Sequence, residues 1–142
     1  MSMSTAIIRV KFVEVGIHCW PSAPKHRAYL RNPHRHRFFV TVETEVYHDD
    51  REIEFHDLLD DAKKLFHVKL GWSCEHMARH LAAALGVKYR RRIVVIVSED
   101  GECESEVSLN SAMAQVVCAR EVAASKALKR KRRPGGRRRR KA

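Results

Sequence analysis

Two long segments of alternating polarity, residues 7–18 and 35–47, constrain the fold of this chain more than any other feature. A period of two sends successive side chains to opposite faces of a strand, so each segment predicts a β-strand with one apolar face. The stretch between them, residues 19–33, contains three prolines and predicts a long loop. If the two strands pair across this loop, they form a hairpin. The apolar residues of the even-numbered face are Ile8, Val10, Phe12, Phe38, Val40, Val42 and Val46.

The remaining segments predict helices and further strands. Ser73 and Asn110 are suitable helix N-caps, because their side chains can accept hydrogen bonds from the free N–H groups of a first turn. The acidic segment 102–109 is ambiguous. The predicted elements are a short strand at residues 52–55, helices at 56–66 and from Ser73 to Gly86, a strand at 92–98 with apolar residues on both faces, and a helix after Asn110. This order predicts an α+β fold with its helices grouped on one face of a largely antiparallel sheet.

The positive charge of the chain is concentrated at its C-terminal end. Of the 28 Lys and Arg residues, 11 lie in residues 126–142, which contain no acidic residue, whereas residues 1–125 carry 17 basic and 17 acidic residues. We therefore predict one domain over residues 1–125 and a disordered basic tail over residues 126–142, because such a composition cannot bury apolar surface. A tail of this kind can contact nucleic acid without sequence preference, and a solvated, inert tail is the alternative.

Composition and cysteine spacing predict a cytoplasmic protein that does not enter a membrane. No apolar run approaches the ~18 residues needed to span a bilayer. Residues 1–16 lack the basic start and the unbroken apolar stretch of a secretory signal. The four cysteines are widely spaced and form no CxxC pair, so we expect reduced thiols.

Three of the nine histidines share a geometry that predicts a metal site. His34 and His36 are two residues apart at the start of a strand, so their side chains emerge on the same face. His18 ends the preceding strand on the even face, and a hairpin would bring the three imidazoles together. Three neutral imidazoles with one open position are typical of catalytic zinc, although copper, iron and nickel also accept imidazole. The alternative is a basic strand end without metal, while His76 and His80, one helical turn apart but off the apolar stripe, are predicted to be solvated.

Six motifs follow one another in a specific order along roughly residues 5–107. They are the strand ending in His18, the His34-Arg35-His36 strand, Glu52-Ile53-Glu54-Phe55, Leu65-Phe66-His67, Ser73-Cys74-Glu75-His76 and Val97-Ser98-Glu99. This order resembles the 6-pyruvoyl-tetrahydropterin synthase family, which includes the 6-carboxy-tetrahydropterin synthases of queuosine biosynthesis.

The resemblance implies a tunnelling fold in which several subunits close a barrel, with the sites between subunits and hence a homo-oligomer. By the same resemblance, His18, His34 and His36 would hold Zn²⁺. Glu99 would bind the substrate ring by accepting hydrogen bonds from its NH groups. His67 would be the acid–base histidine.

The chain departs from the family pattern at the residues that handle protons. The family has a cysteine a few residues before the HxH pair, but residues 28–33 contain none, and Cys19, beside the first predicted zinc ligand, is the nearest candidate for its role. Phe66 stands where the family has the Asp that precedes the catalytic histidine. Arg35 replaces the Gly between the two histidines and adds a hydrogen-bond donor.

These departures favour one reaction class. A base is required where a proton must be removed from carbon, whereas decarboxylation releases carbon dioxide and leaves a carbanion that needs stabilisation and a proton. We therefore predict a zinc-dependent carbon–carbon lyase acting on a pterin- or 7-deazaguanine-like ring, such as a decarboxylase of 7-carboxy-7-deazaguanine. The alternative is a catalytically inactive relative that binds a ligand, or nucleic acid through its basic tail.

Overall fold

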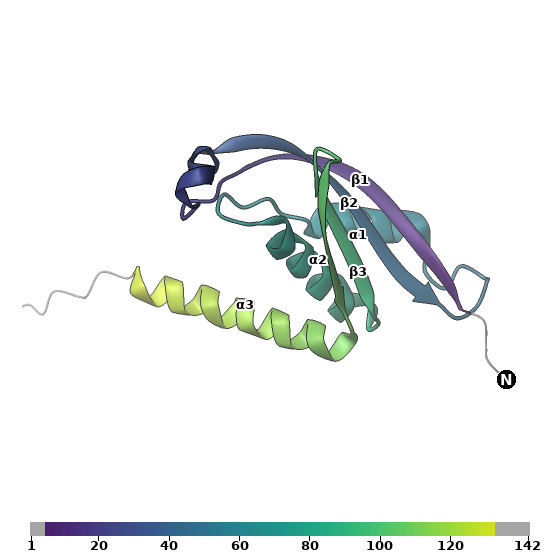
Figure 1. Cartoon of the computed structure of the whole chain (residues 1–142). Coiled ribbons are helices and arrows are strands. Elements are labelled where there is room, and N and C mark those ends of the chain that lie inside the picture. Colours follow the sequence, from purple (N-terminus) through teal and green to yellow (C-terminus); the bar gives the residue numbers. More distant parts are fainter. Residues whose placement is uncertain (1–4, 133–142) are drawn as a thin grey trace, which may run out of the picture.

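An open four-stranded antiparallel sheet forms one layer of the fold, and helices form the other (Figure 1). The computed structural model describes residues 5–132. The elements are β1 (Ala6–His18), the 3-10 helix η1 (Lys25–Arg31), β2 (His34–Val46), α1 (Phe55–Leu65), α2 (Cys74–Tyr89), β3 (Ile93–Glu99), β4 (Cys103–Leu109) and α3 (Ser111–Lys131). The strand order is β1-β2-β3-β4, so β1 and β4 are the two edges. The predicted α+β class and antiparallel sheet are confirmed.

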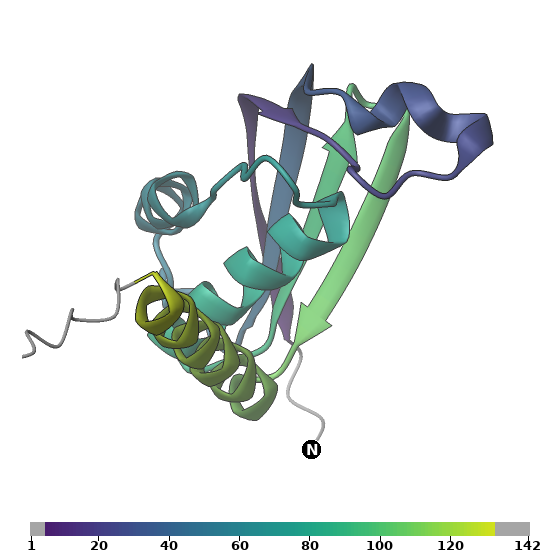
Figure 2. The same cartoon turned by 90° about the vertical axis from the view of Figure 1, so that its left-hand side faces the viewer.

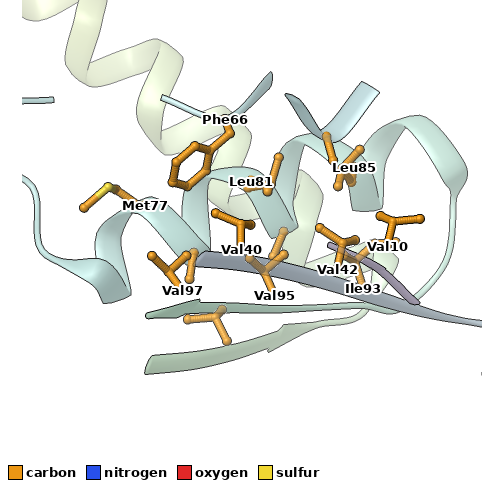
Figure 3. Packing of buried hydrophobic residues seen from close by; sticks show 14 of the residues in the cluster. Val10, Val40, Val42, Phe66, Met77, Leu81, Leu85, Ile93, Val95 and Val97 are labelled. Atoms are coloured by element: carbon orange, nitrogen blue, oxygen red, sulfur yellow. The ribbon is translucent and has the colours of Figure 1, made fainter. Parts of the chain in front are cut away.

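The three α-helices gather on one face of the sheet, as Figure 2 shows, and no helix covers the other face in the described residues. α1 packs against β1, α2 packs against β3 and β4, and α3 packs against α2. The predicted apolar face of β1 and β2 points into the space between the layers, which explains why these strands alternate in polarity. The core shown in Figure 3 contains Val10, Val40, Val42, Phe66, Met77, Leu81, Leu85, Ile93, Val95 and Val97.

The structure corrects one predicted segment and defines another that the sequence left ambiguous. The predicted strand at residues 52–55 is absent from the sheet. Instead, Glu54 is the N-cap of α1, because its side chain accepts a hydrogen bond from the backbone N–H of His56. The ambiguous segment 102–109 forms the edge strand β4. Asp100 and Gly101 make the turn that leads into it, with φ values of 54° and 78°, a backbone conformation that favours Asp, Asn and Gly.

The structure corrects the start of the predicted basic tail. Residues 126–131 are not a separate disordered segment but the last turns of α3. The physical reason is that a helix already nucleated by its packed N-terminal half continues readily through good helix formers such as Ala, Leu, Lys and Arg. The rest of the predicted tail, residues 133–142, lies outside the described residues. Within residues 5–132, none of the helices has the length and apolar content that crossing a bilayer would require.

Candidate metal centre

Three histidines converge at the end of the β1–β2 hairpin, and we call them the strand histidine cluster: His18, His34 and His36. In the antiparallel register, His18 lies opposite His34, and His36 lies opposite Gly16, two pairs further along. The ring centroids are 4.8 to 5.1 Å apart, and one ligand nitrogen from each histidine lies within 4.8 Å of the other two. The predicted convergence is confirmed, and the cluster could hold a metal ion.

Each imidazole of the cluster is oriented by a partner outside it. The Nδ1 atom of His18 lies 2.9 Å from the carbonyl oxygen of Trp72, and that of His34 lies 2.8 Å from the carbonyl oxygen of Asn32. The Nδ1 atom of His36 lies 2.5 Å from a carboxylate oxygen of Asp100. These oxygens can only accept, so the Nδ1 atoms donate their protons outward. Each neutral ring therefore keeps the lone pair on Nε2, the form in which histidine binds a metal.

Asp100 is itself fixed in the charged form that suits this role. Its Oδ1 accepts the backbone N–H of Arg37 at 2.9 Å, and its own N–H donates to the Arg37 carbonyl at 2.8 Å. The hydrogen bond from the Arg37 N–H, followed by that from His36, holds the pKa of Asp100 below its usual value. A carboxylate on the outer nitrogen of a ligand histidine also increases the basicity of that ligand.

The inner nitrogens of the cluster fit a cation. The buried Nε2 atom of His36 has no hydrogen-bond partner among residues 5–132, a state that costs about 1–3 kcal/mol for an ordinary buried polar atom. The Nε2 atom of His18 lies 3.1 Å from Oε1 of Glu99. With the His18 proton on Nδ1, this pair brings two lone pairs together, and a metal ion or a proton between them would remove the repulsion. The donor set therefore matches a metal ion that accepts imidazole.

The loop between α1 and α2 closes over the end of β1 and supplies one of the outer partners. Gly16 makes this approach possible, because a Cβ atom there would lie 2.6 Å from the side chain of Val68. The backbone N–H of Cys19 donates to the carbonyl oxygen of Leu70 at 2.6 Å. These contacts place the Trp72 carbonyl beside His18.

A pocket of about 530 Å³ adjoins the cluster, within the size range of small-molecule sites. Two indole rings line it, together with the predicted residues Cys19 and Glu99. Its wall includes His18, His34, Trp20, Trp72, Cys74 and Glu99.

Cys74 donates a hydrogen bond from its thiol to Oε1 of Glu99 at 3.6 Å. Burial, followed by the nearby Glu99 carboxylate, raises the pKa of Cys74 to about 12. A thiol with this pKa stays protonated at neutral pH, so Cys74 does not replace the thiolate of the resembled family. Its role here is to orient Glu99 in the pocket.

His67 lies elsewhere, in a second group of imidazoles that we call the α2 histidine group: His67, His76 and His80. His76 and His80 lie against Trp72, and His67 lies beside His80. The rings of His67 and His80 have centroids 5.7 Å apart, and His67 is not among the described residues that line the pocket. His76 is exposed, as predicted, and stacks on Trp72. The prediction of a solvated His80 is wrong, because α3 covers part of its ring and Glu121 accepts from its Nδ1 at 2.9 Å.

Sequence reasoning missed the outer partners of the cluster. Asp100 had a usable signal: it forms an Asp-Gly turn dipeptide directly after a strand, beside a residue already singled out. The Trp72 carbonyl had none, because any residue carries a backbone carbonyl and only the folded loop places this one.

Comparison with known proteins returns no family model that matches the chain and no curated protein that matches it. The family resemblance of the sequence motifs therefore stays a prediction. What the site can do follows from three inward-facing imidazole lone pairs beside a pocket that also holds a carboxylate and two indole rings.

Proposed function

We propose that the protein is a zinc-dependent carbon–carbon lyase that acts on a pterin- or 7-deazaguanine-like ring. The observation that carries the proposal is the convergence of three imidazoles, each with its Nδ1 directed at an outer acceptor. The pocket beside them is large enough for a ligand with a planar ring. Three neutral imidazoles with an open fourth position are the ligand set of catalytic zinc. When bound there by His18, His34 and His36, zinc would supply a Lewis acid for an anionic substituent of the substrate.

The pocket residues favour a flat, nitrogen-rich substrate. Trp20 and Trp72 offer aromatic surface against which a planar ring can pack. Glu99 offers carboxylate oxygens that can accept from adjacent ring NH and amino groups, as the family resemblance implies. Because the Cys74 thiol donates to Oε1, the carboxylate keeps a defined orientation, and its other oxygen, Oε2, would accept from a ligand.

The lack of a cysteine at residues 28–33, where the resembled family has one, favours decarboxylation within this class. In that reaction the bond between the ring carbon and the carboxylate carbon breaks, its electron pair stays on the ring carbon, and carbon dioxide leaves. The ring carbon then takes up one proton. We propose His67 as the donor of that proton, and Cys19, which lines the pocket, as a residue that contacts the substrate.

Because His67 does not line the pocket of its own chain, the proposal includes a homo-oligomer in which His67 reaches the pocket of a neighbouring subunit and the open sheet closes into a barrel. The bare face of the edge strand β1 supports this, because it exposes large apolar side chains that a single chain leaves uncovered. These residues are Ile7, Val13, Val15 and Ile17.

The experiment measures bound zinc and release of carbon dioxide from 7-carboxy-7-deazaguanine or a carboxylated pterin. We expect about one zinc per chain in the wild type and loss of both zinc and activity in His36→Ala. Glu99→Gln should retain zinc but bind substrate weakly, whereas His76→Ala, as the matched histidine control for the metal site, should retain zinc. Absence of bound zinc from the wild type would contradict the metal assignment.

The role of His67 has its own test. His67→Ala should retain zinc and lose activity, and mixing it with inactive His36→Ala should restore part of the activity if one site takes residues from two subunits. Unchanged activity in His67→Ala would remove it from the reaction.

A second candidate is a catalytically inactive relative that binds a ring-like ligand or nucleic acid. It is favoured by Phe66, which replaces the acidic partner of His67 in the resembled family, and by the missing cysteine. Retained zinc and ligand binding without release of carbon dioxide from either substrate would favour this candidate over the lyase.

A further inference from the structure

The C-terminal half of α3 does not pack against the protein core. The N-terminal half packs against α2 through the buried Ala114, and Glu121 bonds to His80. From Val122 to Arg132, by contrast, every residue is exposed. Figure 1 shows this end of α3 projecting from the other elements, and we call residues 122–132 the free half of α3.

The free half is basic along one face. Lys126, Lys129 and Arg130 are spaced i, i+3 and i+4, so they lie on the same side of the helix. Lys131 and Arg132 follow, and the free half contains no acidic residue. The sequence beyond it, residues 133–142, adds six Lys or Arg residues and again no acid. Because residues 1–125 carry balanced charge, this end of the molecule is where a polyanion would bind.

We propose that the free half of α3 is a DNA-binding arm that lies in the major groove of duplex DNA and contacts the phosphates on either side. An α-helix with its side chains is about 10–12 Å across, which matches a major groove about 12 Å wide. A helix can enter the groove only if its sides are uncovered, and the free half meets this requirement. Its other residues are mostly small, among them Ala123, Ala124, Ser125 and Ala127, which keeps the helix narrow.

The composition of the arm favours duplex DNA over other polyanions. Residues 111–142 contain no aromatic residue, so the arm offers no surface on which the bases of a single strand could stack. The deep, narrow major groove of duplex RNA does not admit a helix. Insertion at a lipid surface requires a broad apolar face, and Val122 and Leu128 are the sole large apolar residues of the free half.

The first test compares two full-length variants with equal loss of charge. In the arm variant, Lys126, Lys129 and Arg130 are each changed to Gln. In the control, three exposed lysines of the body, Lys11, Lys25 and Lys63, are changed to Gln. The probe is a labelled DNA duplex of mixed sequence, titrated at salt concentrations from about 50 to about 200 mM.

We expect the arm variant to bind at least about tenfold more weakly, and the slope of log affinity against log salt to fall by about 3, one for each phosphate that the variant no longer neutralises. The control should bind within about twofold of the wild type, since its lysines lie outside the proposed interface. Equal reductions in the two variants would overturn the proposal. A tighter affinity for single-stranded DNA, duplex RNA or anionic phospholipid vesicles than for duplex DNA would also overturn it.

The second test separates a helix in a groove from a flexible polycation. Ala127→Pro keeps every charge but breaks the helix between Lys126 and Lys129, because proline lacks the N–H and collides with the preceding turn. The free half does not pack on the core, so the melting temperature should be unchanged. We expect about fivefold or greater loss of duplex affinity in Ala127→Pro and none in Ala127→Gln, since glutamine favours the helix. Wild-type affinity in Ala127→Pro would refute the helical arm.

Discussion

The strand histidine cluster and the α2 histidine group each bring three imidazoles together, yet their surroundings differ. In the strand cluster, the outer nitrogen of every ring meets a carbonyl or carboxylate oxygen, and the inner nitrogens converge. In the α2 group, two of the three rings lie against the indole of Trp72 instead. His76 stacks on the indole with 7° between the planes, and the ring centroid of His80 lies 5.1 Å from that of the indole.

The spacing of histidines alone therefore does not make a metal site. A pair two apart on a strand and a pair four apart on a helix both place rings side by side. What distinguishes the two sets is where the ring protons go: fixed outward protons leave inward lone pairs. Within residues 5–132, the strand cluster is the group of three that satisfies the geometry of a metal site. The α2 group links the loop before α2, α2 itself and α3 through Glu121, which is a structural role.

The largest expected contrast between the two sets is in metal affinity. His36→Ala removes one of three ligands, and we expect zinc affinity to fall by more than about a hundredfold, because loss of an outer partner alone costs about 10- to 100-fold. His76→Ala removes an imidazole from the α2 group instead and should leave zinc affinity unchanged. Competition with a chromogenic chelator measures both. Equal reductions of zinc affinity in the two variants would mean that the strand histidine cluster and the α2 histidine group do not differ in metal binding.

A smaller effect should follow from an outer partner. Asp100→Asn keeps a residue that accepts the positive φ of 54° but removes the carboxylate that accepts from His36. We expect zinc affinity to fall by about 10- to 100-fold, with the fold and the β3–β4 turn retained. The same titration, with circular dichroism as a check of folding, provides the measurement. An unchanged affinity would show that Asp100 does not tune the ligand.

In the α2 group the expected effect is on stability. His80→Ala removes the partly buried bond to Glu121 that joins α2 to α3, and we expect the free energy of unfolding to fall by about 1 kcal/mol. Zinc affinity should not change. Urea denaturation of the metal-free protein measures the first quantity, and chelator competition measures the second. A loss of zinc in this variant would contradict the separation of the two sets.

The smallest expected effect is a change in the stability of the metal-free protein at acidic pH. The pKa of Asp100 is lower in the folded chain than its ordinary value of 3.8, so the folded state favours the carboxylate. Its contribution to stability is therefore complete above about pH 4 and is lost as the pH falls through the lowered value. The difference in urea midpoint between wild type and Asp100→Asn should shrink between about pH 6 and about pH 3. A difference that grows toward acid would have the wrong sign.

Much of the fold could be predicted because it depends on local pattern. The even-numbered apolar residues of β1 and β2 form one face of the core, as their period of two requires. The caps at Ser73 and Asn110 begin α2 and α3 as predicted, since each side chain accepts a hydrogen bond from the first turn. Residues 52–55 were predicted incorrectly because Glu54 serves as a helix cap there, and the short segment carries too little pattern to distinguish a strand from a cap.

The candidate site also has residues that local pattern could place and residues that it could not. His34 and His36 share a face because they are two apart on a strand, and His18 joins them because the hairpin pairs it with His34. The sequence could not place His67, since the course of the loop after α1 depends on how Gly16 and Val68 pack. The roles of His67, Cys19 and Glu99 in catalysis or substrate binding stay predictions.

The amino-acid sequence was sufficient to determine which side chains share a face, because the periods of strands and helices act over a few residues. It also showed where the positive charge is concentrated. The tertiary structure decided what those side chains meet. The Trp72 carbonyl is far from His18 in the chain, and Asp100 is far from His36, yet both hydrogen bonds set the protons of the cluster. Only the folded sheet and the closing of the α1–α2 loop bring such distant groups into hydrogen-bond range. The tertiary structure also shows that α3 continues into the basic segment without packing against the other elements there.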